Sequence, residues 1–92
     1  METVKGKKIL ITGASGGIGS NAAKLLAGGG ATIFICGRNA EKLSAVANSL
    51  NLPESNIFIG DLSKEEQVKL LKEKYFKQLS SIDILINAAG IG

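Results

Sequence analysis

The chain contains no histidine and no tryptophan, and only one cysteine and one proline among its 92 residues. The lack of histidine excludes a catalytic imidazole and most zinc sites, and we predict no metal site. A single cysteine cannot form an internal disulfide, and it fits a reducing compartment. Because Cys36 lies in an apolar run, we expect a buried small hydrophobic residue rather than a reactive thiol.

Long apolar runs and a strong charge of one sign are also absent. No run approaches the ~20 apolar residues of a membrane span, and no sustained signal-peptide core precedes Ile9. Eleven basic and eight acidic residues give a net charge of +3. The lysines of residues 64–77 share their segment with three glutamates, which favours a solvated helix face over a phosphate-binding stripe. We therefore expect a cytoplasmic protein that binds neither nucleic acid nor a membrane.

Glycine, by contrast, is abundant, with 12 residues. Residues 8–19, KILITGASGGIG, form an apolar run, a glycine-rich turn and the start of a helical pattern. Gly13, Gly17 and Gly19 follow Thr12 in the spacing T-G-x-x-x-G-x-G. Glycines let a backbone turn tightly and approach a phosphate, and the helix start directs N–H groups at it. The alternative is a turn that only joins a strand to a helix.

Hydrophobic periodicity and turn residues predict the other elements. Strands are expected at residues 8–12, 31–36, 57–59 and 82–86, and helices at about 17–27 and 40–50, with one more opened by residues 63–66. Glycines 28–30 should end the first helix, Asn39 should cap the second, and Ser63 with Glu66 should form a capping box for the third. The residues expected to face the core are Ile18, Ala22, Leu25 and Leu26 of the first helix and Val68, Leu71 and Tyr75 of the third.

This alternation of strands and helices predicts an α/β fold with a parallel sheet and right-handed crossovers. The β-α-β-α-β-α-β order resembles a doubly wound, Rossmann-type fold, which implies the strand order 3-2-1-4. Ligands of such sheets bind beyond the carboxyl ends of the strands. The sheet would be incomplete, because the last strand lacks a neighbour on one edge.

Two further motifs follow the glycine turn along the chain. Asp61-Leu62 ends the third predicted strand, and the sequence N-A-A-G at residues 87–90 ends the fourth. Together the three motifs resemble the N-terminal half of a short-chain dehydrogenase/reductase over almost the whole chain. The resemblance makes residues 1–92 the N-terminal part of an NAD(P)-binding Rossmann domain. The opening residues 5–13 look most like the 3-oxoacyl-[acyl-carrier-protein] reductases of fatty-acid synthesis.

The resemblance implies a set of cofactor-binding residues. Ser15 would hydrogen-bond a phosphate or the adenosine ribose, or would only cap the helix. Asp61 would bind the adenine amino group, with the Leu62 backbone on the ring, or would only cap the next helix, a role that Ser63 fills better. Asn87 would tie neighbouring strands together. The full set is Gly13, Ser15, Gly17, Ile18, Gly19, Arg38, Asp61, Leu62, Asn87, Ala88 and Gly90.

The end of the second predicted strand indicates NADP(H) as the cofactor. NAD-preferring relatives carry an acidic residue where Gly37 stands, and Arg38 follows. A guanidinium can hold a 2′-phosphate with paired, charge-assisted hydrogen bonds. Such bonds are worth about 1.5–3 kcal/mol, which would favour NADPH by roughly one to two orders of magnitude. Gly16 stands where many NADPH-dependent relatives carry a second basic residue, which weakens the preference; the alternative is that Arg38 is simply solvated.

No catalytic residue is predicted within the chain. The family uses a Ser and a Tyr-x-x-x-Lys pair, but Tyr75, the only tyrosine, is followed four residues later by Leu79. The resemblance implies an NADPH-dependent homo-oligomeric reductase of about 250 residues that acts on a small-molecule or acyl-carrier-protein-bound carbonyl. The alternatives are a non-catalytic NADP-binding module or a fragment that self-associates through the open edge of its last strand.

Overall fold

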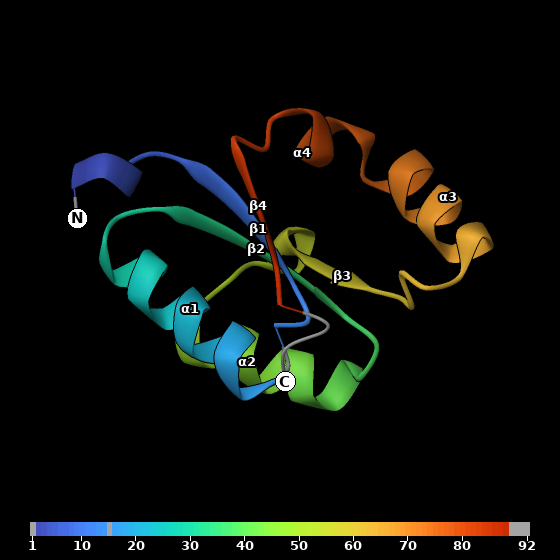
Figure 1. Ribbon diagram of the computed structural model, residues 1–92, viewed down its shortest axis with the longest axis horizontal. Helices are drawn as coiled ribbons and strands as arrows, with labels where there is room; N and C mark the ends of the chain where they lie inside the picture. The colour runs from blue at the N-terminus through green and yellow to red at the C-terminus, as the bar shows by residue number, and fades with distance from the viewer. Residues whose placement is uncertain (1, 15, 89–92) are drawn as a thin grey trace.

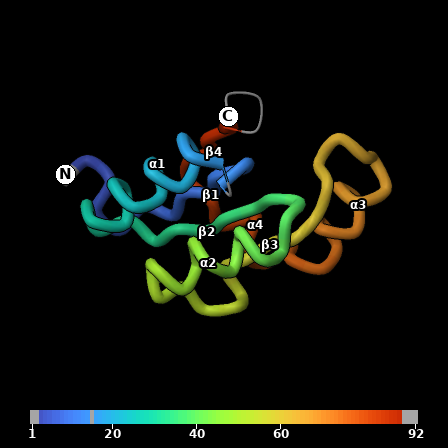
Figure 2. Tube along the Cα trace, turned by 90° about the horizontal axis from the view of Figure 1, so that it is seen from below, coloured from blue at the N-terminus to red at the C-terminus, as the bar shows by residue number. Residues whose placement is uncertain are grey.

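The computed structural model describes residues 2–14 and 16–88, and its centre is a four-stranded parallel sheet (Figure 1). The strand order is β3-β2-β1-β4, as predicted. The strands are β1 (Lys8–Thr12), β2 (Thr32–Gly37), β3 (Ile57–Ile59) and β4 (Ile84–Asn87). Seen from the side of the first two helices, the strands follow one another from β4 to β3 (Figure 2). Only β4 departs from its expected bounds by more than one residue, because it begins two residues later.

Helices cover both faces of the sheet. The helices are α1 (Gly17–Gly28), α2 (Ala40–Leu50), α3 (Glu65–Lys74) and α4 (Phe76–Ser80), with short 3-10 turns η1 (Glu2–Val4) and η2 (Glu54–Asn56). Figure 1 shows α1 and α2 on one side and α3 and α4 on the other. The Asn39 side chain caps α2 by accepting from the Lys42 N–H at 3.0 Å, as predicted. No helix of residues 2–14 and 16–88 is long and apolar enough to cross a membrane.

Alternating side chains of β1 and β2 divide the interior into two cores. Under α1 and α2 the fully buried core residues are Ile9, Ile11, Ala14, Ala23, Ile33, Ile35, Leu43 and Ala47. The opposite face buries Phe34, Cys36 and Phe58 against Leu10, Leu71, Tyr75, Leu79 and Ile82. Burial on both faces explains why β2 is a continuous apolar run instead of an alternating one. Leu71 and Tyr75 thus face inward, as expected, and Cys36 is buried at 2% exposure.

The predicted buried face of α1 is wrong for two residues. Ile18 is 49% exposed and Leu25 is 69% exposed. Ala22 and Leu26 pack against the core as predicted, and the buried residues beside them are Gly19 and Ala23 in place of Ile18 and Leu25. Both sets fit helical spacing, and the small residues allow α1 to lie closer to the strands than Ile18 would permit.

The predicted capping box at the start of α3 is also wrong. The N-cap position is Lys64, without a side-chain cap hydrogen bond. The Ser63 hydroxyl donates to Asp61 Oδ1 at 2.6 Å, so it is engaged in a local turn before the helix begins. The third helix also stops at Lys74, because Tyr75 has a non-helical ψ of 28° and its ring packs 4.4 Å from the Phe58 ring centre. A separate helix, α4, follows.

Candidate functional site

The carboxyl ends of all four strands lie at one edge of the sheet and are linked by backbone hydrogen bonds. Each link joins the residue after one strand to the end of its neighbour. The three bonds run from Ala88 N–H to Thr12 O, from Gly13 N–H to Cys36 O and from Gly60 N–H to Gly37 O, each at 2.9 Å. The loops that follow the strands are therefore held at fixed positions around one space.

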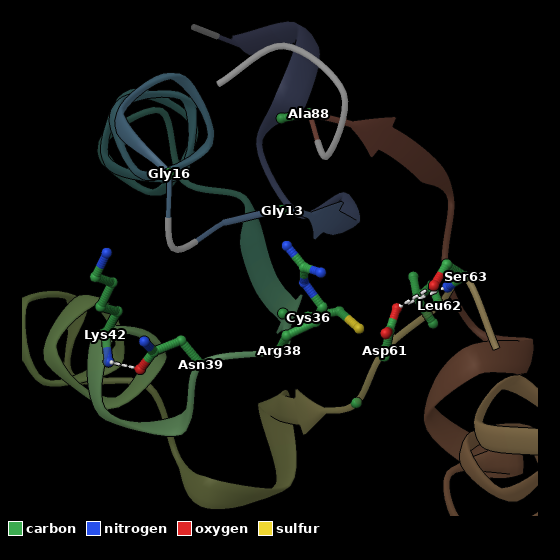
Figure 3. A pocket seen from close by; sticks show the side chains of 12 residues that line it. Gly13, Gly16, Cys36, Arg38, Asn39, Lys42, Asp61, Leu62, Ser63 and Ala88 are labelled. Carbon is green, nitrogen blue, oxygen red and sulfur yellow. Dashed lines mark hydrogen bonds between the residues drawn. The ribbon is translucent and has the colours of Figure 1, made fainter.

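That space is a cavity of about 530 Å³ (Figure 3). Its walls come from the glycine turn, the end of β2 with the start of α2, the loop after β3 and the end of β4. The lining residues are Gly13, Gly16, Cys36, Gly37, Arg38, Asn39, Lys42, Gly60, Asp61, Leu62, Ser63 and Ala88. The cavity has the position that ligands occupy in open parallel sheets.

Gly13, Gly17 and Gly19 of the turn differ in the structural reason for being glycine. Gly13 has φ = +71°, which L-residues with a side chain rarely adopt. A Cβ on Gly19 would lie 2.4 Å from the Gly13 carbonyl oxygen, so only glycine lets α1 start against the turn. A Cβ on Gly17, in contrast, would meet no atom within 4 Å. The described protein atoms therefore leave the space before Gly17 open to a ligand.

The start of α1 supplies a second feature suited to an anion. Its N-cap residue is Gly16, which has no side chain to accept from the N–H groups of the first turn. Those groups carry the positive end of the helix dipole, and anions bind there. Gly16 also lines the cavity, so the helix begins at its wall.

Two cations reach the cavity from the end of β2 and the start of α2. Arg38 directly follows β2, and Lys42 lies in the first turn of α2; both are exposed. In Figure 3 both side chains extend from this end of the sheet toward the glycine turn. Gly37, the residue before Arg38, is buried and brings no carboxylate. The wall can therefore attract a phosphate.

Asp61 faces these cations from the loop after β3. Its Oδ1 accepts hydrogen bonds from the Ser63 hydroxyl at 2.6 Å and the Ser63 N–H at 3.0 Å. These bonds from Ser63, followed by the charges of Arg38 and Lys64, lower the pKa of the Asp61 carboxyl below its usual value. Asp61 is thus a carboxylate at neutral pH, suited to accept from an amino group. Its side chain does not cap α3, which removes the alternative role considered for it.

Asn87 joins the edge strand β4 to its neighbour β1, as expected. The Thr12 hydroxyl donates to Asn87 Oδ1 at 2.9 Å, across the parallel pair of β1 and β4. The next residue, Ala88, is 5% exposed and closes the cavity at the end of β4. A larger side chain at residue 88 would occupy space between the backbone and a ligand.

Cys36 brings a buried thiol to the cavity wall. Burial raises the pKa of its thiol to about 11, so the group is a neutral thiol at pH 7. Its expected role as a small hydrophobic residue is consistent with this environment. The sequence pattern gave no indication that Cys36, Lys42 and Ser63 would line the cavity, because their contacts depend on how neighbouring strands end.

The structure brings five of the predicted cofactor residues to the cavity wall: Gly13, Arg38, Asp61, Leu62 and Ala88. Gly17 and Asn87 each adjoin a lining residue in the chain, but they do not line the cavity themselves, and neither do Ile18 and Gly19. Ser15 and Gly90 lie outside the described residues. Tyr75 is partly buried and packs against the core that contains Phe58, as expected for a core residue. No cluster of metal-ligating side chains occurs in residues 2–14 and 16–88.

Comparisons with known proteins agree with this geometry. The family model "short chain dehydrogenase" matches residues 7–92. Glucose 1-dehydrogenase of Gluconobacter oxydans is 42% identical over 92% of this chain and 33% of its own length. An oxidoreductase structure from Escherichia coli has a TM-score of 0.80 and 34% identity, and it covers 94% of this chain and 37% of that one. A 3-ketoacyl-(acyl-carrier-protein) reductase from Brucella melitensis complexed with NADH has a TM-score of 0.72 and 33% identity, over 89% of this chain and 34% of that one.

The chain spans about a third of the length of the curated relatives that it matches. Those relatives are oxidoreductases, a glucose dehydrogenase and a nodulation protein. Because the family model matches nearly all of the sequence and the fold agrees with solved members, this chain belongs to the short chain dehydrogenase family.

Proposed function

We propose that residues 1–92 are the N-terminal, cofactor-binding part of an NADPH-dependent short-chain reductase. The observation that carries the proposal is the cavity at the carboxyl edge of the sheet. It joins an open glycine turn at the start of α1 to Arg38 and Asp61 on facing loops. The pyrophosphate would lie at Gly17 and the first turn of α1, and the adenine amino group at Asp61. When bound, the nicotinamide supplies or accepts a hydride.

Arg38 supports NADP(H) over NAD(H). The buried Gly37 leaves no carboxylate to repel a 2′-phosphate, and the Arg38 side chain extends into the same space (Figure 3). The Brucella relative was solved with NADH, so family likeness alone does not favour either cofactor. The preference therefore depends on Arg38 in this chain.

The substrate proposal is a carbonyl, either on a small molecule or on an acyl carrier protein. Two observations support it. The fold is similar to that of a 3-ketoacyl-(acyl-carrier-protein) reductase, and the sequence of residues 5–13 resembles the opening of such reductases. The described residues hold and orient the adenosine half of the cofactor, and none of them is assigned to proton transfer. The proposal includes a cytoplasmic location, which the single buried cysteine fits. It also includes a homo-oligomeric whole protein.

Calorimetric titration of the protein with NADPH and NADH tests the cofactor assignment. We expect Arg38→Ala to lower the affinity for NADPH by about one order of magnitude and to leave that for NADH unchanged. Lys24→Ala, on the exposed side of α1, is the matched control and should change neither. An Arg38→Ala protein that still prefers NADPH would overturn the assignment.

A second candidate is a non-catalytic NADP-binding module. Its support is that Tyr75 is packed against Phe58 and is not available as a general acid. The intact mass of the protein from its native host separates the two candidates. A mass near 25 kDa, which corresponds to about 250 residues, with NADPH oxidation on added carbonyls supports the reductase. NADPH binding without turnover at the mass of the 92-residue chain supports the module.

A further inference from the structure

We propose that Lys42 is a specificity-determining residue that binds the 2′-phosphate of the cofactor together with Arg38. This inference rests on the proposed NADP(H) site and names a residue that the sequence motifs do not indicate. Lys42 lies one helical turn beyond Asn39, at the start of α2, and lines the same cavity as Arg38 and Gly16.

The position of Lys42 is fixed by the cap of α2. Its backbone N–H donates to the Asn39 side chain at 3.0 Å, so the first turn of the helix is held next to the end of β2. This hydrogen bond holds the Cα of Lys42 close to the end of β2, where Arg38 follows the strand. The long side chain starts at this fixed point and extends toward the glycine turn at Gly16 (Figure 3).

Gly16 leaves room for that side chain. A Cβ at Gly16 would contact only the Gly13 carbonyl oxygen, at 3.5 Å, so the space in front of the residue holds few described protein atoms. A basic side chain at residue 16 would approach a phosphate from the glycine turn. In this chain Lys42 can deliver an ammonium to the same region from the opposite wall.

The net charge of the cavity lining explains why a second cation would help to bind an additional phosphate. The cavity is lined by three charged side chains, the cations Arg38 and Lys42 and the carboxylate Asp61. Without Lys42, Arg38 and Asp61 would cancel to a net charge of zero. Lys42 makes the lining positive by one unit, which favours a ligand that carries an additional phosphate.

Asp61 does not neutralise Lys42 directly. Its carboxylate is held by the Ser63 hydroxyl and N–H on the far loop, and the positive charges that lower its pKa are those of Arg38 and Lys64. The Lys42 ammonium is exposed, so its attraction to a phosphate should weaken as salt is added.

The test compares two small ligands that differ in the 2′-phosphate. Adenosine 2′,5′-diphosphate and adenosine 5′-monophosphate are titrated calorimetrically into the whole protein and into Lys42→Gln, Arg38→Gln and Lys69→Gln. Lys69, which is exposed on α3 and outside the cavity, is the control for the loss of one charge. We expect Lys42→Gln to weaken the diphosphate about fivefold, as for a partly solvated ion pair, and to leave the monophosphate unchanged.

The outcomes separate this inference from the function on which it rests. If Lys42→Gln and Lys69→Gln both leave diphosphate affinity unchanged while Arg38→Gln reduces it, the role of Lys42 is wrong and the NADP(H) site stands. If the unchanged protein binds the two ligands equally, the NADP(H) preference and the role of Lys42 are both wrong. An equal loss for both ligands in Lys42→Gln would show a general effect on α2 and would also overturn the specificity role.

Discussion

Strands β2 and β4 flank β1 on opposite sides, yet their environments differ. Residues 33–37 of β2 are all buried, whereas β4 exposes three of its four residues. Both are parallel strands of similar apolar composition. β2 lies inside the sheet with α2 on one face and α3 and α4 on the other, while β4 is an edge strand whose Leu85 is 63% exposed.

The difference shows that one strand can serve the site without contributing much to the core. β2 holds the hydrophobic core and delivers Arg38 to the cavity. β4 contributes through its end, where Thr12 bonds to Asn87 and Ala88 closes the cavity. Mutations in the two strands should therefore affect stability and binding to different extents.

Truncation in β2 should have the largest effect on stability. Ile35 is fully buried, so Ile35→Ala should lower the free energy of unfolding by about 2–5 kcal/mol, and the milder Ile35→Val by about 0.5–1.5 kcal/mol. Leu85→Ala in β4 should cost less than about 0.5 kcal/mol. Urea denaturation measures all three, and equal losses in the two strands would contradict the comparison.

The thiol chemistry of the two strands should also differ. With a pKa raised from 9.0 to about 11, Cys36 should react with iodoacetamide at pH 8 about 100-fold more slowly than in urea-unfolded chain. Its rate should climb as the pH rises toward about 11, because only the thiolate reacts. In Leu85→Cys, peptide mapping should find the introduced thiol labelled first. Equal labelling of the two positions would show that β2 is not protected.

Within the glycine turn, alanine substitutions at Gly19 and Gly17 should distinguish an effect on helix packing from an effect on cofactor binding. A Cβ at Gly19 would overlap the Gly13 carbonyl oxygen, so Gly19→Ala should destabilise the protein by about 1–3 kcal/mol. Gly17→Ala meets no atom within 4 Å and should leave the melting temperature unchanged or slightly raised. The same Gly17→Ala should weaken NADPH binding, because its Cβ occupies the space proposed for a phosphate. Normal binding by Gly17→Ala would place the phosphate elsewhere.

The smallest expected effect concerns association through β4. An open edge strand with exposed Ile84 and Leu85 favours pairing with another chain, so the 92-residue chain should sediment faster at higher concentration. Leu85→Lys should reduce this association. Leu70→Lys on α3, where Leu70 is 64% exposed, is the matched control and should not. A wild-type chain that stays monomeric with cooperative melting would rule out this use of the edge.

The sequence predicted most element bounds because strand runs, glycine stops and the Asn39 cap are local signals. The sheet order followed from the resemblance to doubly wound folds. The prediction was wrong where the same sequence fitted more than one local structure. The face of α1 depended on whether Ile18 or the smaller Gly19 and Ala23 met the sheet. The start of α3 depended on Ser63, which bonds to Asp61 instead of capping the helix.

The candidate site was predicted where a residue type and its place at a strand end were both informative, as for Gly13, Arg38 and Asp61. Lys42 and Cys36 were not predicted as lining residues because exposed lysines and buried cysteines are common in folds of this kind. Their position at the cavity comes from the register of β2 beside β1 and from the cap of α2. These contacts depend on the tertiary structure, which the spacing of residues in the sequence does not predict.

The most direct test of the central claim is an NMR titration of the ¹⁵N-labelled protein with NADPH. The account predicts that the largest amide shifts fall on the glycine turn, on Gly37 and Arg38, on residues 60–63 and on Ala88, while Ile84, Leu85 and the amides of α4 change little. Shifts concentrated in α3 and α4, or no shifts at saturating NADPH, would contradict the assignment of the cofactor to the carboxyl edge of the sheet.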